Sequence, residues 1–571
     1  IGDNAGTAIT TGDNNVAVGK DALYNNTTAA NNTAVGTNAL GANTTGGNNA
    51  AVGRSALCSN TTATSNTAVG VCALLTTTTS GNNTAVGFCA LKTTSTDSNA
   101  AFGTNALRDQ TTGIYNTAVG SAAGLRTTTG TRNVAIGTSA MICNTTGSCN
   151  TAVGGMDNGT LSTMMCNTTG NRNTAIGNAA LVKNTTADNN TAVGTLALYA
   201  NTTGAKNSAF GVFALENNTT GAENVALGKD SLGANTTGAN NTAVGTNSLR
   251  RNTEGEDNTA VGNLALCTNT TGDHNVAVGL SALHKNTTAD NNVAVGTCAS
   301  GCNTDGHSNV SIGFSALCTN TTGDKNIAIG HQSLLSLATA NEIVAIGYNS
   351  LRALTTGTDN TAVGFEAGKS ITTGDRNTAM GYLALSTMTT VADNTAVGYK
   401  AMTANTSGSN NTAVGKDAML ANTTGANNVA IGQNALETST SGGANTAVGQ
   451  LAAQDLTTGA ENTAIGHEAG NNITTGTNNT LLGHEAGTDA VANVVASNGN
   501  IVIGNNYSAS AKIKIDWTVT SDLRDKTEIE SVPHGLNFVN QITPIKYRFK
   551  TSRENDTPNG VTRYGFKAQE I

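Results

Sequence analysis

The chain has 571 residues, a formal net charge of −8 and a composition unlike that of an ordinary globular protein. It contains 67 glycines but one tryptophan, three prolines and 3% aromatic residues, so it has little bulky material for a conventional core. The charges are sparse and form no basic stripe interleaved with aromatic residues, so we expect no nucleic-acid partner. No apolar run of about eighteen residues occurs, and we expect no membrane insertion.

A five-residue pattern, Asn-x-Ala-aliphatic-Gly, dominates the chain up to Gly504. We count 29 copies from 15–19 to 500–504, with at most one departure in each. Of the 28 intervals between copies, 25 are 17 residues long, and the others are 16, 23 and 21 residues. Because a disordered tract has no reason to keep such a register, the pattern predicts a stack of repeated units. Ile1 and Gly2 fall in the phase of a cut copy, so we expect the chain to be a fragment.

The first part of each unit predicts a short strand and a corner. In the unit 32–48 the strand is centred on Ala34 and Val35, whose side chains point to opposite faces, so we expect both faces to be buried. The aliphatic Val35 is expected to fill the interior of the coil. The alanine face is expected to approach an identical neighbouring chain. Gly36 predicts a corner with positive φ or with no room for a Cβ atom.

The second part of each unit predicts another short strand and a turn. Ala39 and Leu40 are expected to form the strand, and 43–46 a turn in which Asn and Thr side chains bond the local backbone. Stacking of 29 rungs at a spacing of about 4.8 Å predicts a rod on the order of 140 Å long. Helical repeats are rejected because Gly and Asn-Thr-Thr leave no window for a stable helix. We therefore expect an all-β, parallel β-roll or β-solenoid shaft over residues 1–504.

This repeat resembles the head of trimeric autotransporter adhesins, whose parallel β-roll units carry an Asn-x-x-Ala-Ile-Gly-like strand. It is still more similar to the Asn-Thr-Ala-Val-Gly arrays of phage-type tail fibres. The resemblance implies a homotrimer. Since the autotransporter unit is shorter than 17 residues, the resemblance does not fix the handedness of the coil.

The composition changes after Gly504. Residues 505–571 hold 18 of the 66 charged residues and 7 of the 19 aromatic residues. We expect a connecting strand at 505–520, where 512–519 alternates as a strand does, and a small α+β domain from 521 with a short helix at 533–541.

Three motifs follow one another in this last segment. They are Ser-Asp-x-Arg-x-Lys at 521–526, Pro-x-x-Tyr-x-Phe at 544–549 and Gly-Phe-x-Ala-Gln-Glu-Ile at 565–571. Together they resemble the start of the C-terminal intramolecular chaperone domain of endosialidase-type tailspikes and related trimeric fibres. The resemblance covers roughly the last fifty residues. It implies a domain that trimerises the fibre, assists its folding and then cuts itself off.

The resemblance assigns the self-cleavage to Ser521 and Lys526, with the cut between Ser521 and Asp522. A serine hydroxyl becomes an effective nucleophile when a partly desolvated lysine takes its proton. The alternative is that both are ordinary polar residues at a strand end. The sequence stops at Ile571, short of the family's usual helical remainder, which argues against cleavage by these residues alone. A trimerising domain would also set the register, because nearly identical rungs can pair one unit out of step.

Ten cysteines lie between Cys58 and Cys318. Cys72 and Cys89 share a phase on adjacent rungs, and Cys302 nearly shares one with Cys318. Stacked rungs bring such Cα atoms to about 5 Å, within reach of a disulfide. The alternative is that these are small buried residues in a reducing compartment.

Other polar signals are weaker. His467-Glu468 and His484-Glu485 repeat in phase and could hold a cation, but a solvated turn is the simpler interpretation, so we expect no metal and no cofactor. The six-residue excess between Asn150 and Asn173 contains Met156, Asp157, Met164 and Met165, and is the best candidate for a recognition loop.

The sequence therefore predicts a homotrimeric, extracellular or virion-surface fibre with a non-enzymatic shaft. Its expected partners are copies of itself and a host or other cell-surface glycan or receptor. On a long rod, many weak contacts can together replace a strong single site through avidity. The alternatives are a polysaccharide-degrading tailspike and a bacterial trimeric adhesin.

Overall fold

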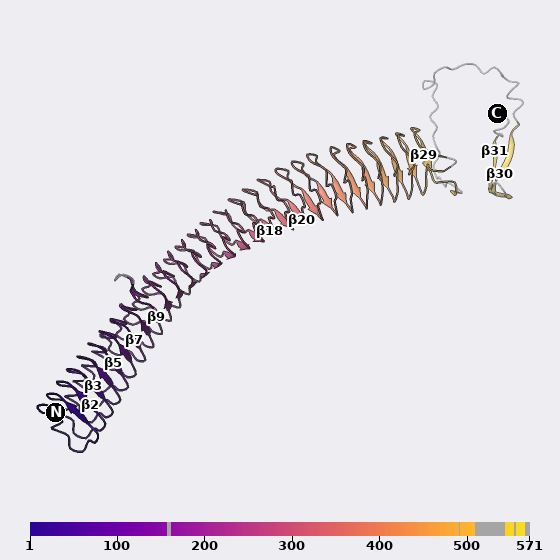
Figure 1. The fold of residues 1–571 in the computed structure, drawn as a ribbon. Coiled ribbons are helices and arrows are strands. Elements are labelled where there is room, and N and C mark those ends of the chain that lie inside the picture. Colours follow the sequence, from indigo (N-terminus) through magenta and orange to yellow (C-terminus); the bar gives the residue numbers. More distant parts are fainter. Residues whose placement is uncertain (157–160, 490–491, 509–542, 553–554, 566–571) are drawn as a thin grey trace. The chain divides into compact units, whose positions relative to one another are not determined.

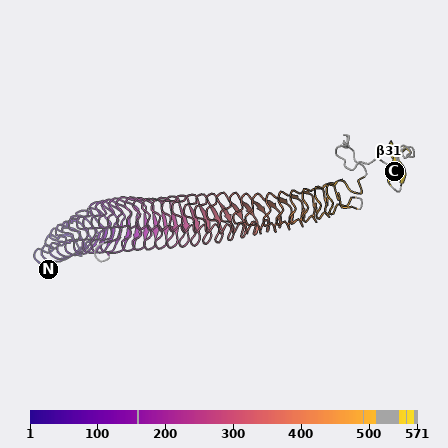
Figure 2. The ribbon, with the colours of Figure 1, turned by 90° about the horizontal axis from the view of Figure 1, so that it is seen from above.

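The computed structural model describes residues 1–156, 161–489, 492–508, 543–552 and 555–565. The chain divides into two compact units, Ile1–Tyr507 and Ser508–Ile571, which are described separately. The first unit is a solenoid in which each turn of the backbone lies on the previous one, as seen from the side in Figure 1 and from above in Figure 2. Every rung contributes one three-residue strand, and no helix occurs in the described parts of the chain.

The strands of the solenoid are β1 (Val16–Val18), β2 (Thr33–Val35), β3 (Ala50–Val52), β4 (Thr67–Val69), β5 (Thr84–Val86), β6 (Ala100–Phe102), β7 (Thr117–Val119), β8 (Val134–Ile136), β9 (Thr151–Val153), β10 (Thr174–Ile176), β11 (Thr191–Val193), β12 (Ser208–Phe210), β13 (Val225–Leu227), β14 (Thr242–Val244), β15 (Thr259–Val261), β16 (Val276–Val278), β17 (Val293–Val295), β18 (Val310–Ile312), β19 (Ile327–Ile329), β20 (Val344–Ile346), β21 (Thr361–Val363), β22 (Thr378–Met380), β23 (Thr395–Val397), β24 (Thr412–Val414), β25 (Val429–Ile431), β26 (Thr446–Val448), β27 (Thr463–Ile465), β28 (Thr480–Leu482) and β29 (Ile501–Ile503).

These strands form one 29-stranded parallel sheet, in which each strand pairs with the next strand of the chain. The register matches the sequence repeat residue by residue, so Thr242 pairs with Thr259 and Ala243 with Ala260. The irregular intervals keep the same register, because β9 and β10 pair in phase across the 23-residue unit. The sequence rhythm is therefore a spatial rhythm, and the predicted β-solenoid is confirmed.

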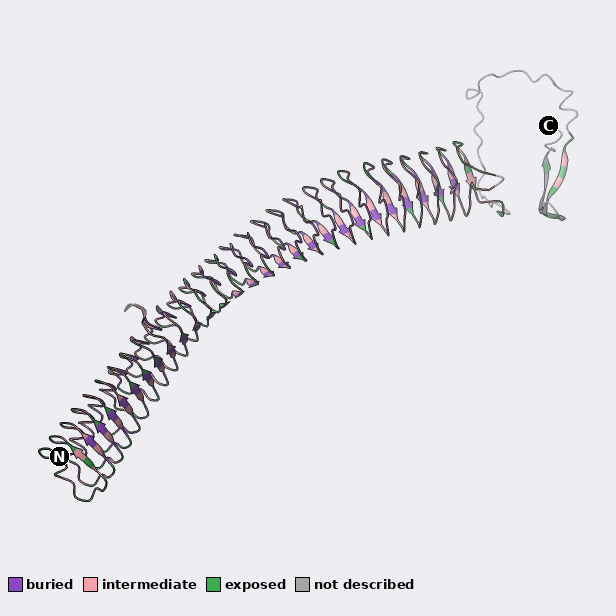
Figure 3. Cartoon of the chain, in the orientation of Figure 1, coloured by how far each residue is buried: buried purple, intermediate pink, exposed green. Residues whose placement is uncertain are grey.

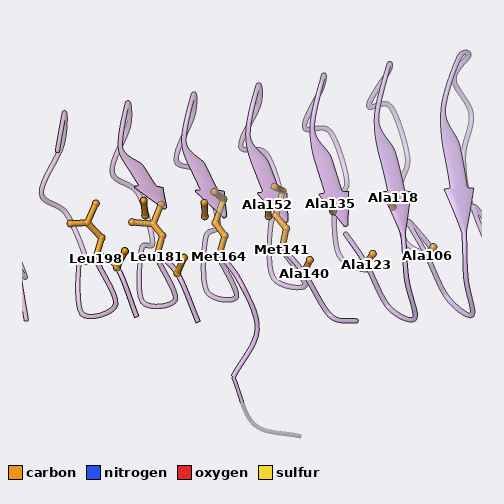
Figure 4. Packing of buried hydrophobic residues seen from close by; sticks show 14 of the residues in the cluster. Ala106, Ala118, Ala123, Ala135, Ala140, Met141, Ala152, Met164, Leu181 and Leu198 are labelled. Atoms are coloured by element: carbon orange, nitrogen blue, oxygen red, sulfur yellow. The ribbon is translucent and has the colours of Figure 1, made fainter. Parts of the chain in front are cut away.

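The inside and outside of the strand are the reverse of the prediction. The middle residue of strands β2 to β28, such as Ala243, is buried, whereas the last residue, such as Val244, points outward and is partly exposed. Figure 3 colours the strands by burial. The interior has room only for a methyl group at the strand because a leucine from the opposite wall, such as Leu249, fills the remaining space. Figure 4 shows this packing, with Leu181 and Leu198 beside the column of alanines.

The predicted Ala-Leu strand is also wrong, because this segment forms turns. Asn38 and Leu40 both have positive φ, at 59° and 49°. A left-handed leucine costs about 1–2 kcal/mol. Here the side chain is fully buried, and the backbone N–H of Leu40 donates to Ala56 O of the next rung at 3.0 Å. Burial and the bond to the next rung hold a conformation that leucine does not prefer in isolation.

The corner glycine has positive φ in every rung, as predicted. At Gly245 φ is +130°, and a Cβ atom would lie 2.6 Å from Gly262 O of the next rung. Glycine is required here for its conformation and for the close approach of the neighbouring backbone.

Two columns of buried asparagines line the solenoid. In the first column Asn241 Nδ2 donates to Gly255 O at 2.7 Å, and Asn241 Oδ1 accepts from the backbone N–H of Asn258 at 3.0 Å. In the second column Asn252 Nδ2 donates to Gly255 O and to Asn235 Oδ1, both at 2.9 Å. The predicted bonding of asparagine to the local backbone is confirmed, and it extends from rung to rung.

On two consecutive rungs, two serines together replace hydrophobic residues of the core. Ser300 replaces the interior leucine and donates to Ser311 Oγ at 2.8 Å, where Ser311 replaces the strand alanine of the next rung. This polar pair separates the two hydrophobic clusters of the core, which end at Ala299 and begin at Ala316. Elsewhere Ile343 replaces an asparagine, and its N–H still donates to Asn326 Oδ1 at 3.0 Å.

The second unit contains an antiparallel hairpin of β30 (Ile545–Ser552) and β31 (Asn555–Gly565), with irregularities in its register. The predicted strand at 512–519 and the predicted helix at 533–541 lie outside the described residues.

Candidate interaction surface

The first and last residues of strands β1 to β29 point outward and form the surface that we call the sheet face. None of these residues is charged. The last residue is Val, Ile, Leu, Met or Phe in all 29 strands. It is exposed in 16 of them, for example to 39% at Val52, 49% at Leu227 and 41% at Met380, and less exposed in the others. The first residue is Thr, Val, Ala, Ser or Ile. The sheet face is therefore a continuous, uncharged strip along the shaft.

The size of this strip distinguishes it from ordinary surface. In the 16 strands whose last residue is more than about a third exposed, that residue leaves roughly 60 Å² uncovered, or on the order of 1,000 Å² in these strands alone. The largest apolar patch on a typical monomer is roughly 300–600 Å². A standard protein interface buries about 800 Å² from each partner. The sheet face is thus large enough for a stable interface.

Charged residues gather instead on the turns, where they pair between neighbouring rungs. Lys206 Nζ lies 2.6 Å from Glu223 Oε1, and both side chains are at least half exposed. Arg376 forms two bonds with Asp393, of 2.7 and 3.0 Å, and this guanidinium lowers the pKa of the Asp393 carboxyl. Exposed pairs of this kind contribute little to stability. They show that the turns face water.

An aromatic ladder runs beside the sheet face on the rungs of β18 to β23. Its rings stack with centroids 5.0–5.3 Å apart and interplanar angles of 7–16°. The ladder consists of Phe314, His331, Tyr348, Phe365, Tyr382 and Tyr399. Because each inner ring covers the faces of its neighbours, the ladder presents mainly ring edges and widens the apolar strip.

The two His-Glu steps lie near the end of the shaft. His467 and His484 stack at 5.1 Å, and each lies within 3.7 Å of the glutamate that follows it. In the described parts of the chain no group of three His, Cys, Asp or Glu side chains is arranged to hold a metal ion.

Sequence reasoning missed one pair of carboxyl groups. Glu216 and Asp230 line a surface hollow of about 260 Å³ together with Arg250. Burial raises the pKa of Glu216, and the charge of Asp230 raises it further. Asp230 is itself paired with Lys229 at 2.6 Å. Only the stacking of rungs brings these residues together, so no local motif could have indicated them.

The structure also corrects the predicted recognition loop. Met164 is fully buried and takes the interior position of the leucines (Figure 4). It therefore belongs to the core, whereas Met156 and Met165 are partly exposed. Asp157 lies outside the described residues.

Ser521, Lys526 and the bond to Asp522 also lie outside the described residues, so their role remains a prediction. The second and third motifs are partly described. Tyr547, from the Pro-x-x-Tyr-x-Phe motif, pairs with Arg563 on β31, and Ile545 pairs with Gly565. The hairpin thus places the second motif beside the first residue of the third.

Comparison with known families decides the character of this segment. Residues 521–571 match the family described as chaperone of endosialidase. This match confirms the resemblance drawn from the three motifs, and together with the β-solenoid it fits a tail fibre that carries such a chaperone segment. No curated protein and no solved structure matches the chain. Within the described residues, no helix has the length and apolar character needed to cross a membrane.

Proposed function

We propose that the chain is the shaft of a homotrimeric, extracellular or virion-surface fibre that reaches and attaches to a host-cell surface. One observation carries the proposal. A 29-strand solenoid with an uncharged sheet face is followed by a chaperone-of-endosialidase segment. That family is associated with trimerisation, and the sheet face is a surface on which identical chains can pack.

The sheet face suits copies of the same chain for two reasons. It carries no charge that would be desolvated, so packing identical faces about a threefold axis places like residues at the same level without repulsion. Its apolar column also runs without a break along the shaft, so identical parallel chains can pack against one another at every rung. Out-of-step pairing by one rung would change few contacts, and the chaperone segment supplies a starting register.

The outer turns serve attachment. The asparagines of these turns are buried, but the second threonine of the Asn-Thr-Thr segments, such as Thr45 and Thr186, faces water, so three parallel chains present many copies of similar polar groups. Many weak contacts to a surface glycan or receptor add up through avidity. This proposal gives the shaft a mechanical and adhesive role, with no reaction of its own.

A photo-crosslinking experiment tests the assembly. Phe102 on β6 is 41% exposed on the sheet face, and Tyr115 on a turn of the same unit is 56% exposed. We replace each with p-benzoylphenylalanine in the full chain, illuminate, and measure mass by denaturing electrophoresis. The substitution at Phe102 should yield covalent dimers and trimers, and the one at Tyr115 should not. The opposite result would place the interface on the turns, and a monomer mass for the unmodified protein under native conditions would refute the trimer.

Attachment is tested separately by sedimentation of the labelled trimer with candidate host cells. Binding that falls steeply when the trimer is dissociated supports avidity. A stable trimer that never sediments with any surface would leave a fibre without an adhesive role.

We also propose that Ser521 and Lys526 cut the chain between Ser521 and Asp522 in a single turnover. The full-length gene is expressed, and the chain mass is measured under native and denaturing conditions. A chain that ends at residue 521 is expected, with no cleavage in Ser521→Ala or Lys526→Ala. Cleavage that persists in Ser521→Ala would refute the assignment.

A further inference from the structure

Six of the ten cysteines form three pairs on consecutive rungs. Cys72 and Cys89 each lie two residues after a corner glycine, and their rungs stack directly, since β4 and β5 pair in register. Cys143 and Cys166 each precede an asparagine of the second column. Those asparagines are bonded to each other, with Asn167 Nδ2 donating to Asn144 Oδ1 at 2.9 Å.

The third pair is joined through the backbone. The N–H of Cys302 donates to Cys318 O at 3.0 Å, so the two residues are neighbours on adjacent rungs. The cysteines are thiols in this structure. Cys89 is buried, and the other five are partly exposed. By contrast, Cys149 and Cys267 have no cysteine at the same or the adjacent position of the rung before or after them.

The thiols of each pair are close enough to influence one another. Burial raises the pKa of the Cys89 thiol, and Cys72 raises it further. Burial likewise raises the pKa of Cys166, with a contribution from Cys143, and that of Cys318, with a contribution from Cys302. Thiols with a raised pKa hold less thiolate at neutral pH, so their oxidation should be slow and should accelerate as the pH increases.

We propose that Cys72–Cys89, Cys143–Cys166 and Cys302–Cys318 are disulfide sites that tie consecutive rungs together. For the first two pairs, which stack in phase, the rung spacing of about 4.8 Å lies within the range of Cα separations that disulfides accept. In the third pair the backbone bond of 3.0 Å between Cys302 N and Cys318 O brings the two residues together. The oxidant is a small-molecule disulfide such as oxidised glutathione. One cysteine thiolate attacks it and releases a small thiolate. The second cysteine thiolate then attacks the protein sulfur of the mixed disulfide and releases another.

The exchange balances. Each cysteine gives up one proton, each released small thiolate takes one up, and two electrons pass from the cysteine sulfurs to the small disulfide. The result would fix the register within the chain. Almost every rung offers the same backbone pairing, but the assigned partners face each other at only these levels, so a rung that slips by one unit would lose the link.

The test uses the full chain in buffers of oxidised and reduced glutathione at pH 8.5. The remaining thiols are then blocked, and the linked peptides are mapped by mass spectrometry. We expect three intrachain links, each with the loss of two hydrogens. Cys149 and Cys267 should be recovered as blocked thiols or as glutathione adducts. Cys72→Ser should remove only the link to Cys89, and Cys267→Ser should remove none.

The proposal fails if the six cysteines remain free after oxidation. It also fails if Cys72 links to Cys58, or Cys318 to Cys298, in place of the assigned partners. A mixture of isotopically light and heavy chains distinguishes links within a chain from links between chains, and links between chains would overturn it. Oxidation should also slow amide exchange in residues 66–98 by about tenfold or more, and Cys72→Ser should abolish that difference.

Discussion

Asn241 gives a quantitative test of the buried asparagine columns. In Asn241→Ile the bond from Asn241 Nδ2 to Gly255 O is lost, but Gly255 O keeps the bond from Asn252 Nδ2 at 2.9 Å. The backbone N–H of Asn258 loses its acceptor at a fully buried residue. The orphaned donor costs about 1–3 kcal/mol and the other lost bond about 1 kcal/mol, so we expect local destabilisation of about 2–4 kcal/mol.

The assay is amide hydrogen exchange of the full chain, followed by mass spectrometry of peptides that cover 241–262. Because 1.4 kcal/mol is a factor of ten, the expected destabilisation accelerates exchange by roughly 30-fold to several hundredfold. Asn263→Ile is the matched control, since Asn263 is exposed and makes one long side-chain bond, to Thr246 O at 3.3 Å. The control should exchange within about twofold of the wild type.

The double variant Asn241→Ile with Asn252→Leu should cost more than the two single variants added together, by about 1 kcal/mol or more, because Gly255 O then loses both of its side-chain donors. The chain itself carries this combination, because Ile343 occurs with Leu337 and Leu354 at positions of the second column, and all three are fully buried. Exchange within twofold of wild type in Asn241→Ile, or strict additivity in the double variant, would refute this reasoning.

Three further predictions follow from particular contacts. Gly245→Ala should destabilise its rung by on the order of several kcal/mol, because φ is +130° and the new Cβ would lie 2.6 Å from Gly262 O. Gly41→Ala should be tolerated, since the nearest atom to its new Cβ lies at 3.5 Å. Local amide exchange measures both, and equal effects would contradict this reasoning. Ser300→Leu with Ser311→Ala should stabilise the rung by about 1–3 kcal/mol. Ser300→Leu alone should not stabilise it, because the Ser311 hydroxyl would then face an apolar side chain. A gain in stability in the single variant would refute the pairing. Arg376→Ala should raise the pKa of Asp393 in an NMR titration, because Arg376 lowers that pKa. The contribution of the pair to stability is therefore present above the carboxyl pKa of the unfolded chain and is lost as the pH falls through the folded value. An unchanged titration would show that the pair is not formed in solution.

Most of the fold could be predicted because the period is written in the residues. The spacing of Gly245 and Gly262 and the alternation around Ala243 define a strand, a corner and a stacking register. Which face of the strand points into the interior could not be predicted in this way. A three-residue strand offers two faces, and choosing the larger side chain for the interior fails because Leu249 already fills the space from the opposite wall.

The turn around Leu40 was mispredicted for a different reason. Leucine favours negative φ, and nothing local signals the positive value that stacking imposes. The pair Glu216 and Asp230 was missed because the two residues approach each other only through adjacent rungs. Motif reasoning did identify the chaperone segment, since three short patterns in fixed order carry more information than any single residue at 521–571.

We infer that the rungs stack in parallel and that three chains pack their sheet faces together. Electron cryomicroscopy of the full chain tests it most directly. We expect a layer spacing of about 4.8 Å along the shaft and the column that contains Val244 and Val261 facing a threefold axis. A shaft whose axis is lined by the Asn-Thr-Thr turns would contradict the packing, and the absence of the 4.8 Å spacing would contradict the solenoid itself.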